Sequence, residues 1–188
     1  LDRPGRYIML QDSDDRKEFI ITRPDTPAPW VNYISNGRYN GLISNTGGGF
    51  SFYKSPKDSR ITRWRYNSLP LDRPGRYIML QDSDTKEYWS PTWQPTCVKL
   101  DSYQCRHGLY YTRISSEYKQ IEASVLYFVP TDDVEIWKLS VKNNSSQPRK
   151  LNLFSFSELC MGHALIDLIN QPNDQHFNEV YFNKSHQL

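Results

Sequence analysis

Residues 122–129 have the sequence EASVLYFV, and this stretch decides the fold class. Apolar side chains recur at every second position from Ala123 to Val129, and the intervening face also carries Leu126 and Phe128. A period of two is the pattern of a β-strand, and apolar residues on both faces indicate a sheet that is covered on each side. The stretch therefore predicts a buried strand.

Several other stretches show the same pattern. They are rich in β-branched and aromatic residues, which half-buried pleated surfaces favour, and they comprise residues 60–66, 75–80, 109–114, 135–142 and 151–158. Turn-forming sequences such as NTGGG at residues 45–49 separate them. Residues 159–169 (LCMGHALIDLI) suit a short helix and a strand equally, because Gly162 interrupts the helical pattern. The sequence thus predicts an all-β protein, an antiparallel β-sandwich.

Composition and charge exclude several classes of protein. A length of 188 residues suits one domain. The net charge of +2 argues against nucleic acid as a partner, and no apolar run is long enough to cross a membrane. We expect no signal peptide from the polar N-terminal stretch and no disulfide framework from three cysteines in a chain of this length. We therefore expect a cytoplasmic protein.

One segment of the chain occurs twice without a change. LDRPGRYIMLQDSD occupies residues 1–14 and recurs at residues 71–84, although the sequence between the two copies does not repeat. Packing would not keep solvent-facing residues identical, so we interpret the duplication as a recent copying, a cloning scar or an assembly error. The second copy continues the strand pattern around it. We therefore take residues 1–14 as the displaced copy and residues 15–188 as the domain.

Motifs for metal, phosphate or nucleophilic chemistry are weak. Cys105 and His107 lack the further ligands that a zinc site requires, so we predict no metal and no cofactor. The glycines at 47–49 lead into the strand-like FSFY, which favours a tight turn or a bulge over a phosphate cradle. Asp132 and Asp133 are neighbours in a turn, which does not suit the flanking carboxylate pair of a glycosidase. We assign no catalytic residue.

Aromatic and arginine residues are the remaining chemical signal. Trp89 and Trp93 flank a short turn, and the segment at 60–66 interleaves arginines with Trp64 and Tyr66. Such residues fill cores and interfaces, but aromatic faces also stack on sugar rings and arginines bind hydroxyls. Three interpretations remain open at this point: packing, sugar binding and, least favoured by the charge, single-stranded nucleic acid.

A set of motifs, taken together, resembles one enzyme family. They are ITRPDTPAPW (21–30), SNGRY (35–39), ISNTGGGFSFY (43–53), RITRWRYN (60–67), DRPGRY (72–77), YWSPTWQP (88–95), YQCRHG (103–108), FVP (128–130) and FSFSE (154–158). In this order they resemble the N-terminal domain of cellobiose and chitobiose phosphorylases. SNGRY and TRWR also resemble cyclic β-1,2-glucan synthases of the same inverting glycoside phosphorylase group.

The resemblance implies a fold and a function. It implies a β-sandwich of the super-sandwich type, incomplete at the C-terminus, that packs on a catalytic (α/α)6 barrel of the same chain. The parent enzyme would be a homodimer that cleaves a β-linked disaccharide or oligosaccharide with inorganic phosphate, which attacks the anomeric carbon with inversion. The sandwich alone would be inactive. The alternatives are a stand-alone carbohydrate-binding sandwich and a non-catalytic interaction domain.

The resemblance also assigns candidate substrate-binding residues. Family sandwiches extend a loop after the FSF-x-E strand toward the acceptor sugar, and in a cellobiose phosphorylase this loop typically has the sequence NFQRNF. The matching stretch here is NQPNDQHF, which names Asn170, Asn173, Gln175 and Phe177 as candidates. Asn173 takes the place of the arginine, and Gln175 the place of the last phenylalanine. This departure argues against cellobiose as the substrate.

Overall fold

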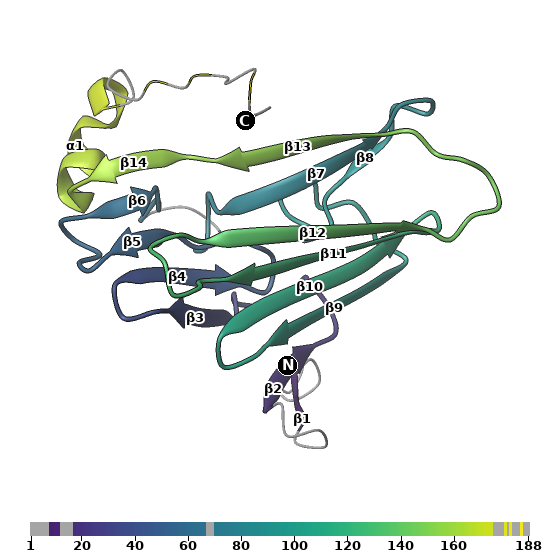
Figure 1. The fold of residues 1–188 in the computed structure, drawn as a ribbon, viewed down its shortest axis with the longest axis horizontal. Coiled ribbons are helices and arrows are strands. Elements are labelled where there is room, and N and C mark those ends of the chain that lie inside the picture. The colour runs from purple at the N-terminus through teal and green to yellow at the C-terminus, as the bar shows by residue number, and fades with distance from the viewer. Residues whose placement is uncertain are drawn as a thin grey trace.

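The computed structural model describes residues 8–11, 17–66, 70–174, 179, 181 and 185. Antiparallel strands in three sheets dominate this part of the chain (Figure 1). The prediction of an all-β sandwich is therefore confirmed. Within the described residues, no helix is long and apolar enough to cross a membrane.

The largest sheet has six strands, and each strand pairs antiparallel with its neighbour. Their order is β1 (Ile8–Gln11), β2 (Glu18–Ile21), β9 (Ser102–His107), β10 (Tyr111–Tyr118), β11 (Ile121–Phe128) and β12 (Ile136–Asn143). The stretch that set the fold class is β11, and it lies between β10 and β12 in full register.

Two smaller sheets complete the structure. The five-stranded sheet has the order β14 (Leu159–Gly162), β6 (Arg60–Thr62), β5 (Ser51–Tyr53), β4 (Tyr39–Ser44) and β3 (Val31–Ser35). The three-stranded sheet has the order β13 (Leu151–Ser157), β7 (Arg76–Asp82) and β8 (Tyr88–Trp89). The helix α1 (Ala164–Asp174) follows β14 at the edge of the five-stranded sheet (Figure 1).

The core lies where the three sheets meet. Val125 and Tyr127 of β11 pack in one buried cluster with Ile34 and Ile43 of the five-stranded sheet and with Ile78 of β7. This follows from the alternation in β11, whose odd-numbered side chains are buried while the even-numbered ones are more open. Burying apolar side chains stabilises a fold by roughly 1.5–3 kcal/mol each, so this cluster fixes how the sheets stack.

A buried ion pair joins the sheets beside this cluster. Arg76 Nε donates to Glu135 Oε1 at 2.5 Å, and the two side chains are 0% and 3% exposed. Trp137 Nε1 donates to the same carboxylate at 2.8 Å, and the Ser51 hydroxyl also donates to it. Arg76 Nη2 donates to the Leu42 carbonyl at 3.0 Å. The buried guanidinium and carboxylate groups thus make several hydrogen bonds within the protein, which compensate for the contacts with water that they lose on folding.

Two predicted elements differ from the structure. The strand predicted at residues 60–66 ends at Thr62, because the Arg63 side chain is buried in an ion pair with Asp167 of α1 instead of alternating along a strand. Residues 159–169 form both of the elements that the sequence allowed. A strand runs to Gly162, and a helix begins at Ala164, where His163 Nδ1 accepts a hydrogen bond from the Leu165 amide at 3.1 Å.

The two copies of the repeated segment lie in different sheets. The described part of the first copy, Ile8–Gln11, is the edge strand β1 and pairs only with β2. In the second copy the same four residues belong to β7, between β13 and β8. That residues 1–14 are a displaced copy and that the domain covers residues 15–188 stay predictions.

Candidate functional site

The candidate substrate-binding residues lie on α1 or after it. Asn170 is half-buried in α1, at a point where the backbone departs from helical geometry (φ −120°, ψ 23°). Asn173 lies in the last turn of the same helix. Gln175 and Phe177 lie outside the described residues. Asn170 and Asn173 thus lie in a helix and not in the loop that the resemblance implies, and the contact of the four residues with a sugar stays a prediction.

Buried charges fix α1 to the sheet. Arg63 Nε lies 3.0 Å from both carboxylate oxygens of Asp167, and Nη2 lies 2.5 Å from Oδ1. Arg63 Nη1 also donates to Glu158 Oε2 at 3.3 Å, and Arg65 Nη2 to the same atom at 2.9 Å. The hydrogen bond that Arg63 donates to Asp167 is the main cause of a raised pKa of Arg63. The network sets the position of the helix.

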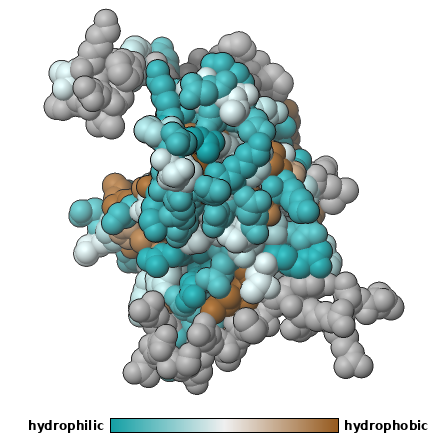
Figure 2. Space-filling view, turned by 90° about the vertical axis from the view of Figure 1, so that its right-hand side faces the viewer, coloured by the Kyte–Doolittle hydropathy of each residue, from teal (hydrophilic) through white to brown (hydrophobic). Residues whose placement is uncertain are grey.

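The outer side of α1 is apolar and exposed. Its Ile169 side chain is 83% exposed, and Leu165, Ile166 and Leu168 are about half exposed. β14, which contacts α1, adds the exposed Met161 side chain to this surface. We call this set the α1 face. The end of the molecule away from α1 is mostly hydrophilic (Figure 2).

The interleaved aromatic and arginine residues pack on one another. The Arg60 guanidinium lies 4.4 Å from the centre of the Phe50 ring, 5.7 Å from Tyr66 and 6.0 Å from Trp64. Trp89 is 1% exposed and belongs to the core, so it cannot stack on a sugar. These residues follow the packing interpretation. Trp93 is the exception, because it is half-buried and lines a pocket.

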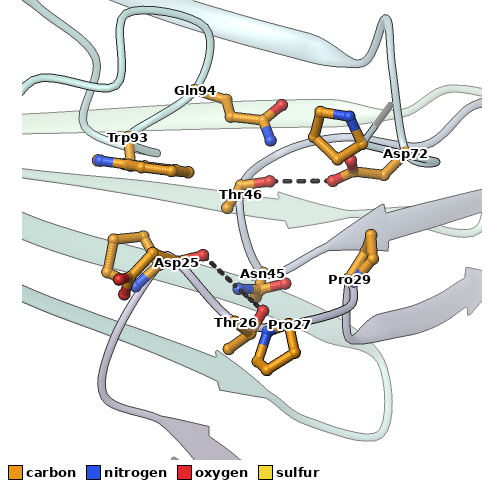
Figure 3. A pocket seen from close by; sticks show the side chains of 11 residues that line it. Asp25, Thr26, Pro27, Pro29, Asn45, Thr46, Asp72, Trp93 and Gln94 are labelled. Atoms are coloured by element: carbon orange, nitrogen blue, oxygen red, sulfur yellow. Dashed lines mark hydrogen bonds between the residues drawn. The ribbon is translucent and has the colours of Figure 1, made fainter. Parts of the chain in front are cut away.

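This pocket has a volume of about 210 Å³ and is formed by loops (Figure 3). The loops lie between β2 and β3, after β4, before β7 and after β8, and they contribute Pro24, Asp25, Thr26, Pro27, Pro29, Asn45, Thr46, Pro70, Asp72, Trp93 and Gln94. Asn45 Nδ2 donates to the Pro24 carbonyl and to Thr26 Oγ1, each at 3.3 Å. These bonds hold the first two loops together.

Hydroxyl groups fix the carboxylate of Asp72 in the pocket wall. Thr46 Oγ1 donates to Asp72 Oδ2 at 2.9 Å, and Ser44 Oγ donates to the same atom at 2.5 Å. The glycine turn at 47–49 makes this approach possible, since a Cβ on Gly48 would lie 2.4 Å from Asp72 Oδ2. Gly47 and Gly49 also have positive φ. The turn interpretation of these glycines is therefore confirmed.

Cys105 and His107 are structural. Both are buried in β9, and burial lowers the pKa of His107 to about 4. One ring nitrogen of His107 lies 2.9 Å from Thr112 Oγ1 and the other 3.1 Å from the Trp30 carbonyl. The residues that the structure describes contain no group of three or more His, Cys, Asp or Glu side chains that could hold a metal ion.

With these elements in place, comparison with known proteins assigns the family. The model of the family described as Glycosyl hydrolase 94, supersandwich domain, matches residues 17–188. The chain belongs to this family. The match covers every strand from β2 onward and both regions described above, the α1 face and the pocket.

Individual glycosyl hydrolase 94 relatives include phosphorylases and a glucan synthase. The chain is 43% identical to N,N'-diacetylchitobiose phosphorylase of Vibrio proteolyticus over 89% of its own length and 21% of the relative's. It is 36% identical to solabiose phosphorylase of Paenibacillus borealis, over 81% of this chain and 20% of that one. It is 30% identical to cyclic beta-(1,2)-glucan synthase NdvB of Rhizobium meliloti (strain 1021), over 80% of this chain and 5% of the synthase. The chain thus spans about a fifth of the phosphorylases it matches.

The sequence alone did not single out the pocket or the anchor of α1. Arg63 and Asp167 are 104 positions apart, and the pocket combines four separate loops. One signal was available, because ITRPDTPAPW, ISNTGGG, DRPGRY and YWSPTWQP each supply pocket residues.

Proposed function

We propose that the chain is the N-terminal β-sandwich portion of an inverting disaccharide phosphorylase. The family match and the identities to two disaccharide phosphorylases support this. In the proposed parent enzyme, inorganic phosphate attacks the anomeric carbon of a β-linked disaccharide and gives a sugar 1-phosphate and a free sugar. Phosphate takes the place that water has in the inverting hydrolytic scheme. No other cofactor is part of the proposal.

The sandwich itself is proposed to have a supporting role. The chemistry is assigned to the (α/α)6 barrel of the same parent chain, so the 188-residue chain alone is inactive. The parent is proposed to be cytoplasmic and to form a homodimer. In it, α1 and the residues after it, including Asn170, Asn173, Gln175 and Phe177, contact the acceptor-sugar site.

The observation that carries this role is the α1 face. A group of exposed apolar side chains on a folded domain suits a place where another protein surface packs. Ile169 is 83% exposed at the tip of this surface, yet Asp167 two positions earlier is buried against Arg63. A helix that is fixed on one side and apolar on the other suits contact with a further domain or subunit.

Paired substitutions in the full-length parent test the proposed role. Ile169→Asp places a charge on the α1 face, and we expect it to weaken the dimer and to raise KM for the acceptor sugar in the synthetic direction. The control is Tyr33→Asp, because Tyr33 is 67% exposed on β3 at the other edge of the same sheet. An unchanged dimer and an unchanged acceptor KM in Ile169→Asp would contradict the role proposed for α1.

A further inference from the structure

We propose that the pocket lined by Trp93, Asp25, Thr46, Asp72 and Gln94 binds one neutral sugar ring of a saccharide. This site goes beyond the proposed role of α1. The pocket loops adjoin β3 and β4, whereas α1 follows β14 at the opposite edge of the five-stranded sheet. A ligand in the pocket is therefore distinct from an acceptor sugar at α1.

Trp93 supplies an aromatic wall. The residue has φ of +71°, which is an uncommon conformation for a bulky side chain, and its amide donates to the Ser90 carbonyl at 2.9 Å. Strained backbone of this kind is found where the surrounding structure fixes a side chain for binding. The ring is half-buried and borders the cavity (Figure 3). A pyranose ring has an apolar face of C–H groups that suits such a flat surface.

Fixed polar groups surround the space beside the ring. Gln94 is 2% exposed, and its Oε1 accepts a hydrogen bond from the Tyr77 hydroxyl at 3.0 Å. This contact fixes the amide, and its nitrogen is directed toward Thr46 (Figure 3). Asp72 is 5% exposed, and its buried Oδ1 has no hydrogen-bond partner among the residues that the structure describes. Buried polar atoms normally have a partner, from protein, water or a ligand.

Charge selects the class of ligand. Among the described residues, the pocket lining includes two carboxylates, Asp25 and Asp72, and no lysine or arginine, although Arg23 and Arg73 contact Asp25 and Gln94 from outside the lining. Carboxylates accept hydrogen bonds from hydroxyl groups and repel phosphate. Arg23 donates to the Asp25 carboxylate at 2.7 Å, and this hydrogen bond lowers the pKa of Asp25, so the carboxylate stays ionised. A neutral, hydroxyl-rich ligand therefore suits the pocket better than a sugar phosphate.

Size limits the ligand to a single ring. The volume of about 210 Å³ lies below the range of about 300–1,000 Å³ that is usual for larger ligands. Several apolar proline rings complete the lining, so the pocket combines apolar surface with a few polar groups, as saccharide and other small-molecule sites do. A longer saccharide would place one ring in the pocket and extend into solvent.

Titration of the 188-residue chain with glucose, N-acetylglucosamine and cellobiose tests the proposal. Binding is followed by calorimetry and by the NMR signal of the Trp93 indole N–H, with inorganic phosphate and glucose 1-phosphate as anionic probes. We expect a neutral sugar to bind in the millimolar range and to shift the Trp93 signal, and the two anions not to do so.

Two variants separate this pocket from other surfaces. Trp93→Gly removes the ring and suits the positive φ, so the fold is kept while sugar affinity falls about tenfold or more. Trp30→Ala is the matched control, since Trp30 is 42% exposed and does not line the pocket. Three results would overturn the proposal: no neutral sugar binds the folded chain, binding survives Trp93→Gly, or the shifted signals lie at α1. Phosphorolysis by the parent is assayed separately, so failure here leaves the proposed function standing.

Discussion

Substitution of Asp167 by asparagine tests the anchor of α1. In the native chain, Arg63 and Asp167 are 2% and 8% exposed and share three contacts of 3.0 Å or less. Removing one partner of a buried ion pair costs about 3–5 kcal/mol. Asparagine keeps one acceptor oxygen, and Glu158 still lies 3.3 Å from Arg63. We therefore expect Asp167→Asn to lower the free energy of unfolding by about 2–3 kcal/mol.

Urea unfolding and hydrogen exchange measure this effect. Hydrogen exchange in α1 should rise more than exchange in β11, because the lost contact joins the helix to the sheet. The control is Asp133→Asn, whose ion pair with Arg38 at 3.1 Å is partly exposed and whose loss should cost less than about 1 kcal/mol. An unchanged urea midpoint together with unchanged exchange in α1 for Asp167→Asn would refute the reasoning.

Three further predictions concern the core and the pocket. Glu135→Ala leaves Arg76 buried without its partner and should cost about 3–5 kcal/mol of stability; a loss below 1 kcal/mol in urea unfolding would contradict the assigned ion pair. The pKa of His107 is lowered to about 4 in the fold, so the native state holds this imidazole neutral where the unfolded chain would protonate it. The free energy of unfolding should therefore be highest above about pH 6.5 and should fall by about 2–4 kcal/mol as the pH drops toward 4. The free energy of unfolding of His107→Gln should not fall in this way between about pH 6.5 and about pH 4. A fall equal to that of the native chain would show that other groups cause the pH dependence. Gly48→Ala places a Cβ 2.4 Å from Asp72 Oδ2 and should cost about 1–3 kcal/mol, seen as a lower Tm; an unchanged Tm would show that the turn adjusts freely.

Local pattern predicted the strands but not where every one of them ends. Alternation over residues 122–129 and 135–142 matches β11 and β12 closely, because β11 buries one face and the alternating Trp137 and Leu139 of β12 are partly buried on one face. The strand predicted at 60–66 stops at Thr62, because a tertiary ion pair redirects Arg63. Tertiary contacts override local pattern at such points.

The candidate site was less accessible to sequence reasoning. The family match confirms the resemblance, whereas the role of the four residues that the resemblance named stays a prediction. Trp93 was a candidate for sugar stacking, but its meeting with Asp72 in one pocket could not be predicted, because only the folded loops bring the two residues together. Similarly, the pattern at 60–66 gave no sign that Arg63 pairs with a helix about a hundred positions later.

The central claim is that this sandwich belongs to an inverting disaccharide phosphorylase. The most direct test incubates the full-length parent with a β-linked disaccharide, such as N,N'-diacetylchitobiose, and inorganic phosphate, and follows the products by phosphorus and proton NMR. We predict an α-configured sugar 1-phosphate, because inversion at a β-linked anomeric carbon gives the α product, and no product with the 188-residue chain alone. Absence of phosphate-dependent cleavage across a panel of β-linked disaccharides, or a β-configured product, would contradict the claim.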